Sequence, residues 1–450
     1  MARRQDSQHR LSRPADAGTA ARVTRVEIPS FERRDLNMKR RQMYSSGARA
    51  STKVTQEGHE MNLSRGTVVY GVGLATACVL LAAGVYAQAR PSGQPGDQKP
   101  QLSEEAFKDV RVLRGIPVKE FMGTMGFFSA SLALNCTDCH GGASASDWAN
   151  YAIDTPLKNK ARQMMAMVKS INEANFGGRP FVTCYTCHRG SQRPKAIPSL
   201  AIQYGEPPPD DPDEIEVVPG VRQTATPDQT FDKYIQVLGG AQALAKLTSF
   251  TAKGTYEGFD SDFAKVPVDV YAKAPNLRAT VVHMAGGDAT STYDGREAWH
   301  AAPATLAPVP LMPLVGADLG GARLDAQLFF PGQIKQLLTN WRADFPAATI
   351  EDQPVQMVQG SMQDGTRVKL YFDKASGLLV RQTRYAPTAV GTIPLHIVYS
   401  DYRVIPGADV KIPFSWQVTW VDGQYTINVA SVQPNAAIDA ARFAKPAPPR

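Results

Sequence analysis

The sequence contains Cys136-Thr137-Asp138-Cys139-His140 and Cys184-Tyr185-Thr186-Cys187-His188, and this repeated pattern decides how the chain around it must fold. Each copy is C-x-x-C-H, the attachment pattern of a c-type haem. Two intervening residues let one helical turn present both sulfurs to the porphyrin edge, and the histidine that follows can bind the iron. We therefore predict two covalently bound haem c groups. The thioether bonds to the porphyrins are expected from Cys136, Cys139, Cys184 and Cys187. The expected iron ligands are His140 and His188.

Two other uses of these cysteines compete with haem. A four-cysteine zinc site would need the two pairs to converge, and zinc ribbons usually place about 15 to 20 residues between pairs, whereas 44 residues separate Cys139 from Cys184. A pair of disulfides would suit an oxidising compartment. Neither use explains a histidine directly after each pair, so the pattern favours haem.

The sixth position on each iron decides between an electron carrier and a haem enzyme. A strong ligand there makes the iron six-coordinate, whereas an empty position lets it bind another molecule. The remaining histidines lie in the N-terminal extension or far downstream: His9, His59, His283, His300 and His396. The last three are too dispersed to form a site. Methionine is therefore the expected donor at both irons.

Candidate methionines lie on two predicted helices. Before the first motif, Phe121, Met125, Phe128 and Leu132 form one helical stripe, with Met122 one step away. Before the second, the apolar face consists of Ala161, Met164, Met165, Val168 and Ile171, and Met167 lies off it. A methionine on such a face is more often core packing than a ligand, but two haems without spare histidines favour coordination.

Charge is concentrated at the N-terminus. The chain has 450 residues and a net charge of +7, of which residues 1–60 carry +6 through 13 basic and 7 acidic side chains. The rest is nearly neutral, so no nucleic-acid-binding surface is expected. We interpret residues 1–60 as a disordered extension or a mis-called start that precedes a second start at Met61.

Residues 61–89 have the parts of an export signal. A short basic region is followed by the apolar run Thr67–Ala87 and the small-residue sequence Ala87-Gln88-Ala89. The run is about 21 residues, long enough to span a bilayer as well. We expect a cleaved signal peptide and a periplasmic protein, with an uncleaved inner-membrane anchor as the alternative.

The composition changes after the second motif. We place a haem domain at 90–200 and a Pro-rich, acidic linker at 201–225, centred on Glu206–Glu214. In the domain 226–450, Thr226-Pro227-Asp228 begins a helix, and ten segments of alternating pattern follow between residues 250 and 430. These predict a curved antiparallel sheet with a partly helical insertion at 303–341, joined flexibly enough for the haem domain to function without it.

Residues 102–194 resemble the cytochrome c subunit of photosynthetic reaction centres and its relatives in non-photosynthetic bacteria. The resemblance rests on EFMGTMGFFSASLALNCTDCH, KARQMMAMVKSIN and VTCYTCHRGSQRP. It implies repeated units of a methionine-bearing helix and a C-x-x-C-H helix, which places the axial methionines at Met125 and Met164. The photosynthetic subunit has four haems and this chain has two such motifs, so docking on a reaction centre does not follow.

The segments YDGREAW, KLYFDKASGLLVRQ and DYR…IPF of the C-terminal region are similar to bacterial periplasmic lipoprotein-carrier half-barrels. This second resemblance, over 226–448, implies a concave sheet that holds acyl chains. A docking domain without chemistry is the competing interpretation, because a fold does not fix a function.

The sequence thus predicts a multidomain protein, in which an α-helical dihaem c-type cytochrome domain precedes an antiparallel β-rich, half-barrel-like domain. The predicted function is a periplasmic one-electron relay rather than an enzyme. Its expected partners are redox proteins or a membrane electron-transfer complex, with no nucleic acid. The alternative is a peroxidase-like haem enzyme with one open iron site, and the C-terminal domain is expected to dock a partner or bind an apolar ligand.

Overall fold

The computed structural model describes residues 99–141, 148–205, 215–363 and 365–449. The described residues all lie in one compact unit. The predicted extension, the apolar run Thr67–Ala87 and the acidic stretch Glu206–Glu214 lie outside the described residues. Among the described helices, none combines the length and apolar character needed to cross a bilayer.

The part of the chain that carries both C-x-x-C-H motifs is helical. Thr155 caps α5 by accepting a hydrogen bond from the Lys158 amide at 3.2 Å, with Pro156 in the first turn. Gly177 ends the same helix in the left-handed conformation. The helices of this part are α2 (Ser103–Ala106), α3 (Val118–Leu132), α4 (Cys136–Cys139), α5 (Pro156–Phe176), α6 (Cys184–His188) and α7 (Leu200–Tyr204), with the 3-10 helix η1 (Trp148–Ala152).

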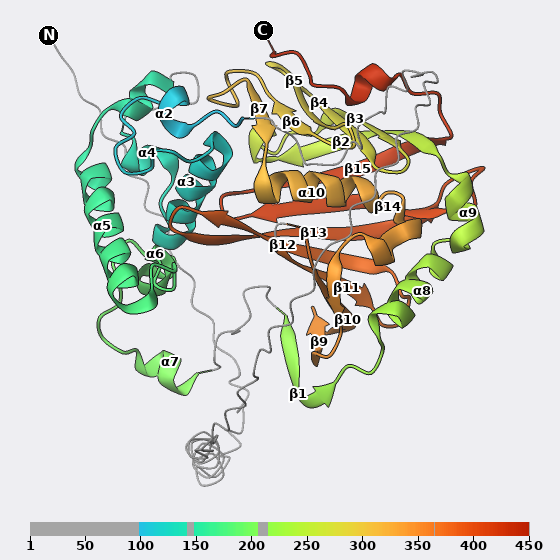
Figure 1. Ribbon diagram of the computed structural model, residues 1–450, viewed down its shortest axis with the longest axis horizontal. Helices are drawn as coiled ribbons and strands as arrows, with labels where there is room; N and C mark the ends of the chain where they lie inside the picture. The colour runs from blue at the N-terminus through green and yellow to red at the C-terminus, as the bar shows by residue number, and fades with distance from the viewer. Residues whose placement is uncertain (1–98, 142–147, 206–214, 364, 450) are drawn as a thin grey trace, which may run out of the picture. The chain divides into compact units, whose positions relative to one another are not determined.

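The C-terminal part is built on one antiparallel sheet (Figure 1). Its ladder runs β1-β9-β10-β11-β12-β13-β14-β15-β2-β3-β4-β5-β6-β7, and β8 pairs with β10. All ten segments of alternating pattern are strands, which confirms the antiparallel sheet. They are β2 (Ser249–Gly258), β3 (Val266–Lys273), β4 (Leu277–Met284), β5 (Gly287–Tyr293), β10 (Gln353–Ser361), β11 (Arg367–Asp373), β12 (Leu379–Thr388), β13 (Gly391–Val404), β14 (Lys411–Trp420) and β15 (Gly423–Pro434).

Five short strands were not predicted from the sequence. They are β1 (Glu216–Arg222), β6 (Ala298–Ala301), β7 (Leu311–Leu314), β8 (Thr339–Arg342) and β9 (Pro346–Ile350). β1 lies in the stretch that the composition assigns to the linker, and it pairs with β9 from Glu216↔Thr349 to Arg222↔Pro346. All seven residues of β1 are exposed, so an alternating apolar pattern is missing there.

The main core lies between the sheet and the helices that cover it. These are α8 (Pro227–Val237), α9 (Gly240–Lys246), α10 (Gly316–Gln327) and the 3-10 helix η3 (Pro331–Gln336). Phe231 of α8 is fully buried and meets Trp341 and Phe372 edge-on. Figure 1 shows α10 lying against the face of the sheet, where it contacts β4, β5 and β12. The predicted helical insertion thus covers part of one face of the sheet.

Helix α3 packs directly on this sheet. Val118 is buried with Val309 and Met312 of the β6–β7 region, and Met122 packs on the same cluster. The hydroxyl of Thr124, itself fully buried, accepts a hydrogen bond from the Ala389 amide at 3.4 Å. A methyl group at Gly126 would meet the Asp422 carboxylate at 2.7 Å, which explains a glycine inside a helix.

The β12–β13 hairpin reaches furthest into the helical part. Thr388 pairs with Gly391 across the turn, and a methyl group at Gly391 would lie 2.7 Å from the Phe127 ring and 3.2 Å from Thr183. Thr183 caps the second motif helix. The structure therefore differs from the expectation that the haem region is independent of the sheet, because the two share buried contacts. The domain boundaries themselves remain a prediction.

Candidate functional site

The first C-x-x-C-H motif forms a single capped helical turn. The Asn135 side chain accepts a hydrogen bond from the Asp138 amide at 3.0 Å, and the Asp138 carboxylate accepts one from the Asn135 amide at 2.8 Å. This reciprocal capping box holds α4 despite its four-residue length. Cys136 and Cys139 therefore stand on one helical turn, with His140 at its end.

The second motif repeats the arrangement with different residues. The Thr183 hydroxyl accepts from the Thr186 amide at 3.3 Å, and the Thr186 hydroxyl accepts from the Thr183 amide at 3.0 Å. Helix α6 then ends at Arg189, whose φ of 47° is left-handed. Two segments with different capping residues thus present Cys, Cys and His in the same order on one turn.

The four thiols of the described motifs are free. Cys136 and Cys187 are exposed, and Cys139 and Cys184 are half-buried. Burial raises the pKa of the Cys139 and Cys184 thiols, so both are neutral at neutral pH. Each motif therefore offers one open and one partly enclosed sulfur.

Both histidines are oriented through the same ring nitrogen. His140 Nδ1 lies 2.9 Å from the Tyr151 carbonyl oxygen, and His188 Nδ1 lies 3.0 Å from that of Ser191. A carbonyl can only accept, so Nδ1 carries the proton and Nε2 keeps its lone pair. Burial is the main cause that lowers the pKa of His140, which keeps its ring neutral. Both imidazoles are therefore prepared to bind a metal through Nε2.

This donor set fits haem c. Each turn supplies two thiols and a neutral imidazole whose other nitrogen is held by a carbonyl, the usual outer support of a metal-binding histidine. Across the described ranges, no three His, Cys, Asp or Glu side chains gather closely enough to hold a metal ion. The two cysteine pairs therefore do not converge as a tetrahedral zinc site requires.

The predicted methionine ligands lie on helices that contact the second motif. Met125 is on α3 and Met164 on α5, both partly exposed, and both helices contact α6. Met122 is engaged in the apolar cluster with Val118, and Met167 is 44% exposed. Met165 is half-buried like Met164, so the role of Met125 and Met164 as the ligands remains a prediction that rests on the resemblance.

An aromatic pair covers the first histidine. The Tyr151 ring lies 4.9 Å from the His140 ring and 5.0 Å from the Trp148 ring, measured between centroids. Trp148 Nε1 donates to the Ala304 carbonyl at 2.6 Å and so ties this loop to the chain after β6. Tyr151 thus contacts His140 with both its ring and its carbonyl.

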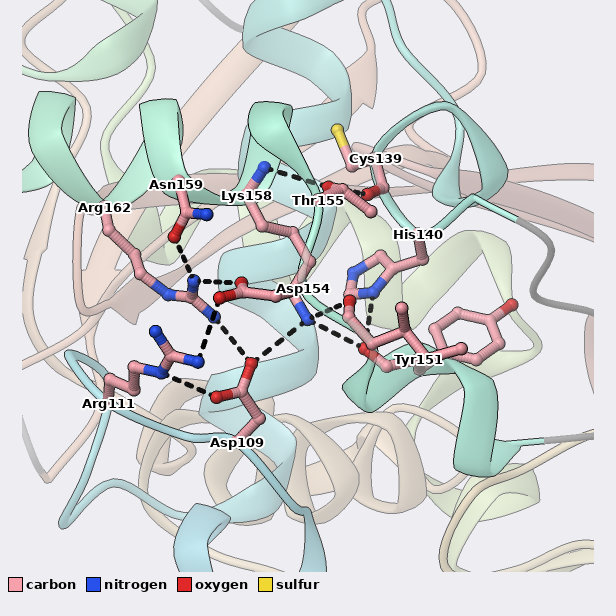
Figure 2. A network of polar contacts seen from close by, with 11 residues as sticks. Asp109, Arg111, Cys139, His140, Tyr151, Asp154, Thr155, Lys158, Asn159 and Arg162 are labelled. Carbon is pink, nitrogen blue, oxygen red and sulfur yellow. Dashed lines mark hydrogen bonds and ion pairs between the residues drawn. The ribbon is translucent and has the colours of Figure 1, made fainter.

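A charged network supports the same carbonyl (Figure 2). Lys158 Nζ donates to the Tyr151 carbonyl at 3.0 Å, so this oxygen accepts from both Lys158 and His140. Arg162 contacts Asp109 at 2.8 Å and Asp154 at 2.5 Å, and Arg111 contacts the same two carboxylates at 2.6 and 3.0 Å. Three cations thus share two carboxylates, leaving one excess positive charge beside His140.

The network is partly enclosed, which strengthens it. The Lys158, Arg162 and Asp109 side chains are 13%, 16% and 17% exposed. Although burial acts in the opposite direction, hydrogen bonds from Arg111 and Lys158 hold the pKa of Asp109 below its usual value. The sequence analysis missed this network. Lys158 and Arg162 are four residues apart on one helix face, and this spacing could have indicated a basic pair in the sequence. Asp109 comes from a separate loop, so its place beside them has no local sequence signal.

The three downstream histidines lie on different strands and do not gather. His283 of β4 lies between Asp288 at 2.9 Å and Asp269 at 3.3 Å. His300 of β6 contacts the Ser291 hydroxyl at 3.0 Å, and His396 of β13 contacts that of Thr383 at 3.2 Å. Each is used within the sheet, which agrees with leaving them out of the predicted site.

Comparison with known proteins confirms the first resemblance. Residues 56–237 match the model of the family described as photosynthetic reaction centre cytochrome C subunit. The subunit from Rubrivivax gelatinosus is 31% identical over 127 residues, which are 27% of this chain and 33% of that protein. The subunit from Thermochromatium tepidum is 35% identical over 101 residues, 21% of this chain and 23% of that protein. The chain thus spans a third or less of the length of these relatives.

Some solved structures are similar to about half of the chain. A LolA superfamily protein from Nitrosomonas europaea has 12% identity and a TM-score of 0.34, covering 49% of this chain and 99% of that one. A DUF1329 family protein from Desulfovibrio piger has 11% identity and a TM-score of 0.35, covering 49% and 98%. At these scores the likeness carries no conclusion about the C-terminal sheet.

Proposed function

We propose that the chain carries two covalent haem c groups and passes single electrons between redox partners. The observation that carries the proposal is the repeated geometry of α4 and α6. In each, two free thiols stand on one turn, and the following histidine has Nδ1 committed to a carbonyl at 2.9 or 3.0 Å. The match to a family of cytochromes supports it.

Each residue has a distinct role in this proposal. Cys136 and Cys139 hold one haem and Cys184 and Cys187 the other, while His140 and His188 bind iron through Nε2. Met125 and Met164 complete the two coordination spheres. When bound, haem supplies reversible one-electron oxidation and reduction, and thioether ligation raises its potential.

The protein surroundings keep this chemistry limited to electron transfer. The Tyr151 carbonyl fixes the plane of the His140 ring, and α3, the helix that carries Met125, is held on the sheet through Val118 and Thr124. Ligands held at both axial positions leave no position for a substrate. A relay rather than an enzyme is therefore the function that this arrangement supports best.

We place the protein in the periplasm, where c-type cytochromes act, with a redox protein or a membrane electron-transfer complex as partner. The relatives are subunits of photosynthetic reaction centres by their names. Apolar side chains near the second motif are exposed: Phe181 by 74%, Tyr185 by 53% and Leu200 by 74%. Such exposed apolar groups suit contact with a haem edge or with a partner.

Mass spectrometry and carbon monoxide test the proposal on the exported full chain. The mass should exceed that of the polypeptide by two haems, and Cys187→Ala should remove one haem and leave the other. The reduced spectrum should not change under carbon monoxide, because both irons are six-coordinate. Zinc or disulfides in place of haem would refute the proposal, and carbon monoxide binding at either site would replace the relay with a haem enzyme.

A further inference from the structure

The C-terminal sheet encloses a small polar cavity that lies apart from both C-x-x-C-H motifs. Its volume is about 40 Å³, enough for roughly three water molecules. The lining includes apolar side chains such as Leu328, Phe329 and Ile397, and α10 contributes one wall. Within this mostly apolar lining lies one cluster of charged side chains, formed by Arg278, Asp325 and Arg384.

Two arginines share one carboxylate in this cavity. Asp325 Oδ1 accepts from Arg384 Nη1 at 2.6 Å and from Gln382 Nε2 at 3.0 Å. Arg278 Nη1 lies farther away, 3.9 Å from Asp325 Oδ2. The three charged side chains are only 14% to 18% exposed. Arginine stays charged at any relevant pH, so the cavity wall has an excess positive charge.

The other polar side chains of the wall can all donate a hydrogen bond. Trp416 Nε1 is buried and has no hydrogen-bond partner among the described residues, although it lines the cavity. Burial raises the pKa of the Tyr399 and Tyr425 hydroxyls, so both keep their protons. A buried donor without a partner has lost its hydrogen bond to water and gained none in return. Excess guanidinium and an unused N–H together call for an acceptor-only group.

We propose that this cavity binds the carboxylate of a small organic acid. A carboxylate only accepts hydrogen bonds, and its two oxygens match the fork of a guanidinium. Arg278 has donor capacity beyond its 3.9 Å contact with Asp325, and its guanidinium stacks 4.8 Å over the Phe329 ring. The anion would accept from Arg278 and from Trp416 Nε1, and its charge would balance the second arginine. The apolar lining suits a short alkyl group.

Asp318, the other acidic residue of α10, also acts electrostatically on Arg384, more weakly than Asp325 does. It does not line the cavity. Asp325 therefore remains the carboxylate of the wall, and the bound carboxylate would be the second. The proposal concerns the sheet and does not depend on haem.

Titration calorimetry of the full chain with sodium acetate tests the proposal, with sodium chloride at equal ionic strength as the reference. Acetate should bind saturably, and Arg278→Met should raise its dissociation constant at least tenfold. Trp416→Phe, which keeps an aromatic ring beside Phe329 and removes the N–H, should weaken binding as well. Arg323→Met, on α10 but outside the cavity lining, is the matched control and should bind like the wild type.

Butyrate and octanoate distinguish the source of the carboxylate. Binding that is lost as the chain lengthens identifies a free short-chain acid, and binding that tightens with each methylene identifies the head of a longer amphiphile. Both results support the carboxylate site, provided that Arg278→Met abolishes the binding of these acids. Acetate heats no larger than those of chloride, or an Arg278→Met variant that binds normally, would overturn the proposal.

Discussion

Replacing Gly391 with alanine tests whether the sheet supports the second motif. The added methyl group would lie 2.7 Å from Cε2 and Cζ of Phe127 and 3.2 Å from Thr183 Cγ2. Phe127 is 7% exposed, so its ring has little room to move. Forcing an extra methyl into such a site costs about 1–3 kcal/mol. Gly391→Ala should therefore lower the free energy of unfolding by about that amount.

A double-mutant cycle ties this loss to the named contact. Phe127→Ala alone should cost about 3–5 kcal/mol, the usual loss for a buried phenylalanine. In the double variant the methyl group meets no ring, so its further cost should fall close to zero. The coupling energy should then be about 1–3 kcal/mol, as for residues in direct contact.

The assay is denaturant unfolding of the haem-loaded chain, followed by Soret absorbance and far-ultraviolet circular dichroism. The two signals should change together, because α3 shares buried contacts with the sheet. Gly332→Ala is the matched control, since a methyl group there meets nothing within 4 Å, and its effect should stay within about 0.5 kcal/mol. Equal stability of Gly391→Ala and Gly332→Ala, or strictly additive losses in the cycle, would refute the reasoning.

Three further predictions concern the ligands, the charged network and pH. Met125→His should lower one haem potential and Met164→His the other in spectroelectrochemical titration, because histidine favours the reduced iron less than thioether does; unchanged potentials would exclude these methionines. Lys158→Met should lower the potential of one haem, since a cation near the iron disfavours its more positive oxidised form. The exposed Lys160→Met is the control, and equal effects would exclude a role for the Tyr151 carbonyl. Burial, with a smaller effect of Lys119, lowers the pKa of His300 from 6.5 to about 4, so the unfolded chain binds a proton that the folded chain does not. Stability should fall by up to about 3 kcal/mol as pH drops through this window, and His300→Gln should flatten the slope in urea unfolding.

Local patterns explain what the sequence predicted correctly. The capped start of α8 at Thr226-Pro227 and the strands of alternating burial, such as β3 and β14, depend on neighbouring residues only. The C-x-x-C-H motifs are equally local, since one helical turn contains each pair of cysteines. Such features are readable because the residues that fix them lie within a few positions of one another.

Contacts between distant segments explain what the sequence missed. β1 is exposed along its whole length and exists because β9 pairs with it, more than a hundred residues later. Asp109 joins Lys158 and Arg162 from a loop about fifty residues earlier. The separation of the haem region from the sheet was inferred from the acidic, Pro-rich stretch, and no pattern near α3 shows that Gly126 faces Asp422. Long-range pairing of this kind has no local signature.

The contact between α3 and the β12–β13 hairpin also sets an order of events in biosynthesis. The Thr124 hydroxyl and the Ala389 amide are 265 residues apart in the chain, so at about 5–20 residues per second the ribosome makes the hairpin roughly 13 to 50 s after the helix. Both cysteine pairs are complete long before their support exists. Under the proposed function, a nascent chain could receive its haems while α3 is still unsupported, and the late arrival of the hairpin would then lock the loaded segment in place.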